Sequence, residues 1–240
     1  MNIVTIIQAR MGSSRFPGKI LKPIGDSYVL NYVVERCRKI IGVSNVIVAT
    51  STLPQDDAIV EWCNQHSVAY YRGSEDNVLS RYVDAAKPFN PDYVMRVTSD
   101  CPFVDYELAS EMVEAIEANP VEIVDIVKQL PRGLAVEIIK YDALLRIHEG
   151  KTEERHREHV TYYAYEYREQ FSRLAFEPNP EIQAPEFRIT LDTLEDYELI
   201  QAIANHFNDP FVSCADVVGY LKENPEIAKI NAHIQQKPVV

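Results

Sequence analysis

Short apolar runs and amphipathic segments alternate along the first hundred residues of the chain. The apolar runs are rich in β-branched residues and end at polar ones, which predicts buried strands over Ile3 to Ile7, Val46 to Ala49, Val68 to Tyr71 and Tyr93 to Val97. The segments between them show helical spacing and predict helices over Tyr28 to Ile41, Asp56 to Asn64 and Ser74 to Ala86, the last capped by Ser74. This alternation is typical of a doubly wound α/β sheet with helices on both faces.

Beyond Asp100 the alternation is less regular. Helical spacing predicts helices over Tyr106 to Glu117, Arg157 to Glu169, Leu194 to Asn208 and Val212 to Asn224. Strands are predicted over Ile123 to Val127 and Phe187 to Leu191, and the segment Pro131 to Ile139 predicts a strand near a sheet edge or an excursion from the sheet. No internal repeat or flexible linker divides the chain, so we expect one domain over residues 1–240.

Composition narrows the class of protein. A hydrophobic content of 46% and a charged content of 25% are ordinary for a globular protein, and no apolar stretch approaches the roughly 20 residues of a membrane span. The chain begins MNIVTIIQARMGSSR, which places its basic residues after the apolar run, unlike a secretion signal. Its four cysteines lack the CxxC spacing of a zinc site and are expected to be reduced thiols. We therefore expect a cytoplasmic protein with no membrane partner.

The net charge of −12 argues against a nucleic-acid partner, because a phosphate backbone needs a basic footprint. The charge is uneven, however: residues 1–40 carry seven Lys and Arg against two acidic residues. A basic island in an acidic chain suits a small polyanion. Arg36, Arg38 and Lys39 of this island are better read as an exposed helix face.

The segment Gln8 to Lys19, which we call the N-terminal loop, directly follows the first predicted strand. It combines small residues, which let backbone N–H groups approach an anion, with three cations, Arg10, Arg15 and Lys19. Ligands of open α/β sheets bind at the carboxyl ends of strands, where this loop begins. The loop is neither GxxxxGK[ST] nor GxGxxG, so the common phosphate motifs are excluded. We expect it to bind a nucleoside triphosphate; a basic surface loop is the alternative.

Two acidic residues follow predicted strands, and the first of them, Asp100, is a candidate magnesium ligand. Asp100 ends the run RVTSD after the fourth strand, and Asp192 ends the run RITLD. Taken alone, Asp100 before Pro102 also fits a turn or helix cap. Thr193, Glu195 and Asp196 fit a helix N-terminus, with Thr193 as cap and acids in the first turn, but this leaves Asp192 unexplained.

The N-terminal loop motif and six ordered motifs after it carry a resemblance to a known family. After IIQARMGSSRFPGK in the N-terminal loop come VIVATST, RGSEDNVLSRY, RVTSDCP, PRGLAVE, REHVT and TLDTLEDYELI, which together span about residues 3 to 203. The chain resembles the cytidylyltransferases that make CMP-activated sugar acids, and within them the spore coat polysaccharide biosynthesis protein F family. The resemblance implies a three-layer, Rossmann-like nucleotide-diphospho-sugar transferase fold with a mostly parallel sheet.

It also implies a reaction and its residues. CMP would pass from CTP to a small acidic acceptor, with release of pyrophosphate and with Mg²⁺ as cofactor. The nucleotide-binding half would cover about residues 1–105, and the acceptor-binding and possible homodimer-forming part about residues 106–240. The implied catalytic residues are Arg15, Lys19, Asp100 and Asp192, of which Asp100 and Asp192 would hold the metal. The implied nucleotide-binding residues are Gln8, Ala9, Arg10, Gly12, Ser13, Ser14, Thr50, Arg72 and Arg81. Candidate acceptor-binding residues are Arg132, Glu137, His159 and Arg188.

Three points stay open. His159 is read as an acceptor contact, a general base or a structural histidine packed among tyrosines. Ala135 stands where the family often has an acid, in the expected acceptor pocket, so the acceptor is not predicted. The alternatives are a glycosyltransferase of related fold, disfavoured because the chain contains no Asp-x-Asp, and a non-catalytic nucleotide-binding protein, disfavoured because both acids are present.

Overall fold

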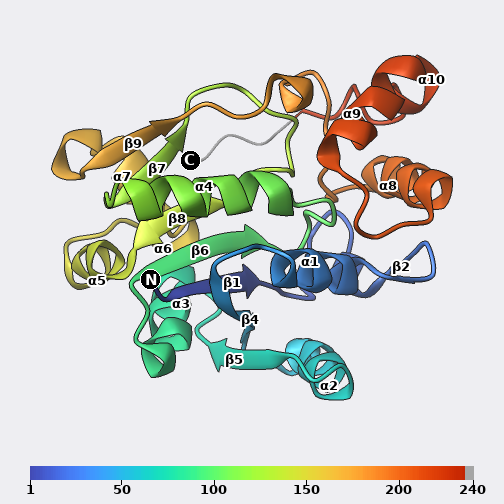
Figure 1. The fold of residues 1–240 in the computed structure, drawn as a ribbon. Coiled ribbons are helices and arrows are strands. Elements are labelled where there is room, and N and C mark those ends of the chain that lie inside the picture. Colours follow the sequence, from blue (N-terminus) through green and yellow to red (C-terminus); the bar gives the residue numbers. More distant parts are fainter. Residues whose placement is uncertain (236–240) are drawn as a thin grey trace.

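A seven-stranded sheet runs through the centre of the molecule (Figure 1) in the computed structural model, which describes residues 1–235. Its strands lie in the order β5-β4-β1-β6-β8-β7-β9. Parallel pairing joins β1 (Ile3–Gln8) to β4 (Val43–Ser51) and β6 (Tyr93–Thr98), and β4 to β5 (Ala69–Gly73). β8 (Glu137–Lys140) runs antiparallel to both β6 and β7 (Ile123–Ile126), and β7 pairs in parallel with β9 (Arg173–Phe176). The sheet is therefore mostly parallel, as predicted.

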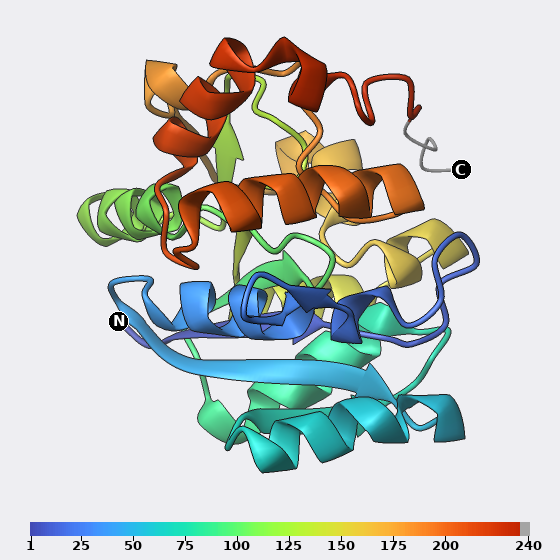
Figure 2. The same cartoon turned by 90° about the vertical axis from the view of Figure 1, so that its right-hand side faces the viewer.

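Helices cover both faces of this sheet and make a three-layer structure (Figures 1 and 2). One core contains residues of α1 (Val29–Arg38), α2 (Asp57–Gln65), α4 (Tyr106–Ala118), α8 (Leu194–Phe207) and α9 (Cys214–Glu223). The other contains residues of α3 (Val78–Ala86) and α5 (Tyr141–Glu149). Ile3 and Ile7 face the first core, whereas Val4 and Ile6 face the second. Because both faces of β1 are buried, its sequence reads as one continuous apolar run.

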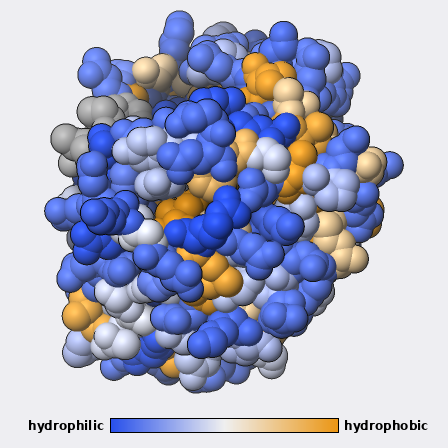
Figure 3. All heavy atoms as spheres, turned by 90° about the vertical axis from the view of Figure 1, so that its left-hand side faces the viewer, coloured by the Kyte–Doolittle hydropathy of each residue, from blue (hydrophilic) through white to orange (hydrophobic). Residues whose placement is uncertain are grey.

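Short elements connect these layers. The hairpin of β2 (Pro23–Ile24) and β3 (Ser27–Tyr28) precedes α1, and α10 (Pro225–Ala228) follows α9. Single 3-10 turns complete the chain over Lys19–Leu21, Pro54–Asp56, Lys87–Phe89, Arg168–Gln170 and Pro180–Ile182. Hydrophilic side chains dominate the face shown in Figure 3, in keeping with the net charge of −12, and its apolar residues form small separate groups. Nowhere in residues 1–235 is there a helix with the length and apolar character to cross a bilayer.

Several predicted elements were wrong, mostly beyond residue 100. A single helix over Arg157 to Glu169 is replaced by α6 (Glu154–Glu158) and α7 (Tyr162–Glu166). The break is at Val160, which has a left-handed φ of 41°. That conformation is unfavourable for a β-branched residue and cannot continue a helix. The predicted strand over Phe187 to Leu191 is reduced to an isolated bridge between Arg132 and Arg188.

Other corrections concern the sheet and one cap. The strand of the Pro131 to Ile139 segment begins only at Glu137 and lies inside the sheet, between β6 and β7, with no edge exposed. Helix α3 begins at Val78 and its N-cap is Asn77, whose side chain accepts from Ser80 N; the Ser74 hydroxyl instead accepts from Asn77 N. Helix α5 and strand β9 were not predicted.

Candidate active site

The N-terminal loop leaves the carboxyl end of β1 and is held against the neighbouring strand. Ala9 N donates to Ala49 O at 3.0 Å, and Gly18, with a φ of 68°, turns the chain into the 3-10 turn that begins at Lys19. The fully buried carboxylate of Asp56 accepts from Met11 N at 2.7 Å and from the Ser51 hydroxyl at 2.5 Å. Asp56, predicted only as the first residue of a helix, therefore fastens the loop to the end of β4.

Lys19 brings the two predicted acids together. Its ammonium nitrogen donates to Asp100 Oδ2 at 2.8 Å, to Asp192 Oδ1 at 2.8 Å and to Leu191 O at 2.6 Å. Only 10% of the Lys19 side chain is exposed, so these partners replace its hydration. Burial opposes its charge, but Asp100 and Asp192 raise the pKa of Lys19 above its usual value. Residues far apart in sequence thus form one charged cluster at the carboxyl ends of β1 and β6.

Asp192 is surrounded by cations. Besides Lys19, Arg15 lies 3.0 Å and Arg188 2.7 Å from its Oδ2. Burial acts to raise the pKa of Asp192, but Lys19 and Arg15 outweigh it, with Arg188 hydrogen-bonded as well, and the pKa lies below its usual value. The carboxylate is therefore ionised at neutral pH.

Asp100 and Asp192 are the residues of this cluster that could contribute ligands to a magnesium ion. Mg²⁺ commonly takes one or two carboxylates together with phosphate oxygens and waters. Asp100 and Asp192 each place an oxygen within hydrogen-bond distance of the same Lys19 nitrogen, so a cation already lies between them. No set of three or more His, Cys, Asp or Glu side chains converges within residues 1–235, so any metal here depends on the nucleotide for its remaining ligands.

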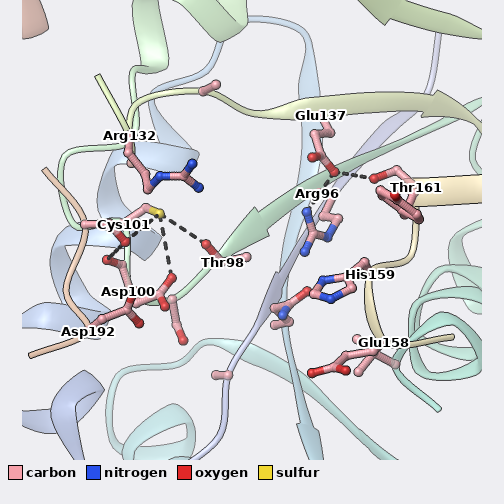
Figure 4. A pocket seen from close by; sticks show the side chains of 18 of the residues that line it. Arg96, Thr98, Asp100, Cys101, Arg132, Glu137, Glu158, His159, Thr161 and Asp192 are labelled. Carbon is pink, nitrogen blue, oxygen red and sulfur yellow. Dashed lines mark hydrogen bonds and ion pairs between the residues drawn. The ribbon is translucent and has the colours of Figure 1, made fainter. Parts of the chain in front are cut away.

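A cavity of about 1760 Å³ opens beside this cluster. Ligand pockets usually measure about 300–1,000 Å³, so this one has room for a nucleotide and a second substrate together. The predicted site residues that line it are Gln8, Ala9, Arg10, Ser13, Ser14, Arg15, Lys19, Arg81, Asp100, Arg132, Glu137, His159 and Asp192. In Figure 4 Asp100 and Asp192 lie at one end of the view, and Glu137 and His159 at the other.

Where nucleotide contacts were predicted, side chains from β1, the N-terminal loop, α3 and the loop before α3 meet. Arg10 lies 3.3 Å from Glu75, and the buried Arg81 donates to Ser74 O at 2.6 Å. The Tyr82 hydroxyl lies 3.3 Å from Gln8 Oε1. Glu75 also lines the cavity and was not among the predicted site residues.

Four predicted site residues do not line the cavity. Thr50 is fully buried within β4, and Gly12 packs so closely on Gln55 that a Cβ there would lie 2.7 Å from the Gln55 amide nitrogen. Arg72 donates to Ser51 O at 2.9 Å and pairs with Asp57. Arg188 is buried against Asp192 and Asp196. Arg188 therefore lies behind Asp192 and does not line the cavity in which its acceptor contact was predicted.

The part of the cavity where acceptor contacts were predicted is built on an ion pair between two strands. Arg96 of β6 lies 2.8 Å from Glu137 of β8, and the Thr161 hydroxyl donates to the same Glu137 oxygen (Figure 4). Burial opposes the charge of Arg96, but Glu137 raises its pKa above the usual range. Glu137 was predicted as a site residue, but Arg96 was not, because its position inside a strand is typical of a core residue.

His159 and Arg132 both line the cavity, Arg132 on the side of Cys101 and Asp100 and His159 on the side of Glu137 (Figure 4). Burial lowers the pKa of His159, so its imidazole is neutral at pH 7 and can accept a proton. The turn at Val160 separates His159 from Thr161, and both side chains line the cavity. Cys101, also in the wall, is no nucleophile, because burial raises its thiol pKa to about 12.

Fold and site together define a nucleotidyltransferase: a doubly wound sheet whose carboxyl edge carries a cationic loop, two acidic residues and a large polar cavity. Comparison with known proteins agrees. The cytidylyltransferase family model matches residues 4–232, so the chain belongs to the cytidylyltransferase family.

Three relatives illustrate this membership. The spore coat polysaccharide biosynthesis protein SpsF of Bacillus subtilis is 35% identical over 234 residues, covering 95% of this chain and 97% of that protein. The solved structure of a cytidylyltransferase from Leptospira borgpetersenii is 32% identical with a TM-score of 0.88, and the match covers 98% of this chain and 99% of that one. A 3-deoxy-manno-octulosonate cytidylyltransferase of Trichlorobacter lovleyi is 31% identical over 122 residues, about half of each chain (50% and 47%). The predicted resemblance to sugar-acid cytidylyltransferases and to the SpsF family is confirmed.

Proposed function

We propose that this chain transfers CMP from CTP to a sugar acid and releases pyrophosphate, as a step in making a surface polysaccharide or glycan. The observation that carries the proposal is the contact of Lys19 with both Asp100 and Asp192 at the mouth of the cavity. Family membership supplies the nucleotide, and two relatives, SpsF and the 3-deoxy-manno-octulosonate enzyme, supply the acceptor class and the pathway.

The reaction needs positioning and charge neutralisation more than covalent help. An acceptor oxygen attacks the α-phosphorus of CTP, the bond from that phosphorus to the bridging oxygen breaks, and pyrophosphate leaves. Lys19 and Arg15 are placed to offset the charge that builds on the leaving pyrophosphate. Asp100 and Asp192 would hold Mg²⁺, which when bound neutralises phosphate charge and lowers the pKa of an attacking hydroxyl.

The acceptor end of the cavity fits an acid that also carries hydroxyls. Arg132 is exposed at its rim, and Glu137 is an ionic acceptor that Arg96 and Thr161 hold in place. We assign Arg132 to the acceptor carboxylate and Glu137 to its hydroxyls. A cation can pair with a substrate carboxylate, and carboxylate oxygens accept hydrogen bonds from hydroxyl donors.

The test is a screen of the four nucleoside triphosphates against a panel of sugar acids, with pyrophosphate release and the mass of the product as readouts. We expect a CMP conjugate with CTP and at least one sugar acid, lost on addition of EDTA and restored by Mg²⁺. UDP-sugars with the same acceptors are the matched control for glycosyl transfer. Nucleotide binding without turnover across the panel would instead indicate a non-catalytic protein.

We also place the enzyme in the cytoplasm as a homodimer. CTP is available there, and related synthetases are often dimers. Cell fractionation and light scattering on a sizing column test these two points. A mass of 27.4 kDa in solution, that of one chain, would refute the dimer.

A further inference from the structure

The loop that carries Asp192 is organised by Asp196, four residues further along the chain. Asp196 is fully buried at the start of α8, and its Oδ2 accepts from Asp192 N at 2.9 Å and Thr193 N at 3.1 Å. Arg188 Nε donates to Oδ1 at 2.9 Å, while Arg188 Nη2 reaches Asp192 Oδ2 at 2.7 Å. Asp196 therefore holds both the backbone of Asp192 and the guanidinium that grips its carboxylate.

Asn231, beyond α10, completes this arrangement from the far end of the chain. It is 1% exposed, and its Nδ2 donates to Asp196 Oδ1 at 2.7 Å and to Arg188 O at 3.0 Å. Figure 2 shows the red C-terminal segment returning to the end at which α8 begins. Both partners of this Asn231 atom are oxygens that only accept hydrogen bonds, so the atom must be the amide nitrogen.

We propose that Asn231 is a positioning residue for Asp192, acting through Asp196 and Arg188. The Asn231 amide ties the backbone carbonyl of Arg188 to the Asp196 carboxylate. Asp196 in turn holds the backbone of Asp192, and Arg188 holds its carboxylate. This makes the C-terminal segment part of the active-site structure. The inference rests on the proposed function, because it requires Asp192 to act on the nucleotide and its metal.

The geometry predicts what substitutions at this position do. Asn231→Asp keeps the shape of the side chain but replaces the donating amide nitrogen with an oxygen. This oxygen repels Arg188 O and Asp196 Oδ1, to which the amide donated. Asn231→Ala removes the donors without adding charge, so its effect is smaller. Residues that orient a metal-binding carboxylate typically change metal affinity or activity about 10- to 100-fold.

The experiment measures the dissociation constant of CTP with Mn²⁺ by calorimetry, beside turnover in pyrophosphate release. We expect Asn231→Asp to weaken Mn²⁺–CTP binding about tenfold and to lower kcat, while the KM for the acceptor stays within twofold. The matched control is Asn224→Ala, because Asn224 also donates its amide to a backbone carbonyl in the C-terminal part, but to that of Tyr220 in helix α9, at 2.8 Å, and not to the Asp192 loop. It should bind Mn²⁺–CTP like the unaltered protein.

A double variant separates positioning from general damage. If Asn231 acts through Asp192, then adding Asn231→Asp to Asp192→Asn costs little further affinity; losses that multiply would overturn the proposal. Asn231→Asp and Asn231→Ala both within twofold of the unaltered protein would overturn it too, and Asn231→Ala keeps the test valid should the aspartate variant not fold. If Asp192→Asn itself leaves Mn²⁺–CTP binding unchanged, the proposed metal site is wrong, and so is this inference. That result differs from the one in which Asp192→Asn weakens binding and only the Asn231 variants have no effect.

Discussion

Replacing Lys19 by methionine tests the centre of the site, because it removes the charge and keeps the length and apolar stem of the side chain. The ammonium makes three hydrogen bonds of 2.6–2.8 Å, and 10% of the side chain is exposed. Breaking a buried ion pair by removing one partner typically costs about 3–5 kcal/mol. Here Asp192 keeps Arg15 and Arg188, and the Asp100 side chain is 26% exposed to water. We therefore expect a smaller loss of unfolding free energy, about 2 kcal/mol, or a fall in Tm of about 4–8 °C.

The effect of Lys19→Met on catalysis should be larger than its effect on stability. Losing one preorganised donor to developing charge costs about 100- to 1,000-fold in turnover, or about 3–4 kcal/mol in the barrier. Pyrophosphate release under saturating CTP, well below the Tm, measures it. Lys22→Met is the control, because Lys22 follows by three residues and lies over the Phe16 ring outside the cavity. Turnover of Lys19→Met within threefold of the unaltered protein would refute the placement of Lys19 on the phosphates.

Three further predictions follow from the same geometry. Asp100→Asn and Asp192→Asn should each lower kcat by about 100-fold or more, with the far-UV spectrum unchanged; two active variants would exclude the two-acid site. The depressed pKa of Asp192, lowered by its cations against the opposing effect of burial, contributes stability that is present above the unfolded value of about 3.9 and is lost as the pH falls below it. Urea titrations at pH 6 and pH 3 should therefore show a smaller acid destabilisation for Asp192→Asn than for the unaltered protein; equal losses would contradict this. Glu137→Gln should raise the acceptor KM about tenfold through its lost charge-assisted hydrogen bonds, with the CTP KM within twofold; a change in the CTP KM alone would move Glu137 to the nucleotide side.

The first half of the fold was predictable because its strands are buried on both faces. Such strands carry continuous apolar runs, as in Ile3 to Ile7, and regular helices separate them. The second half follows other rules. Strand β9, at the sheet edge, is only half buried and has no clear apolar pattern, so it was missed. The left-handed turn at Val160 was not predictable, since a β-branched residue rarely adopts it, and tertiary packing there overrides local preference.

Tertiary contacts also explain which parts of the site the sequence could predict. The N-terminal loop, Asp100 and Asp192 each follow a strand or a strand-like segment, so their meeting at one sheet edge follows from topology. Arg96 was hidden because it occupies an interior strand position, where a charged residue is tolerated only with a partner such as Glu137. No local signal marks that pairing, because β8 joins β6 from 41 residues further along the chain.

Arg188 shows why a residue type at the right end of a motif does not define its role. A cation four residues before Asp192 was expected to reach an acidic acceptor, yet the nearer carboxylates of Asp192 and Asp196 hold its guanidinium. A buried Arg is stable only where acceptors surround it, and Asp196 supplies them at a helix start where sequence alone indicates an ordinary cap. The cations beside Asp192 therefore differ in whether they line the cavity. Arg188 fixes the carboxylate from behind, while Arg15 and Lys19, which also contact it, line the cavity.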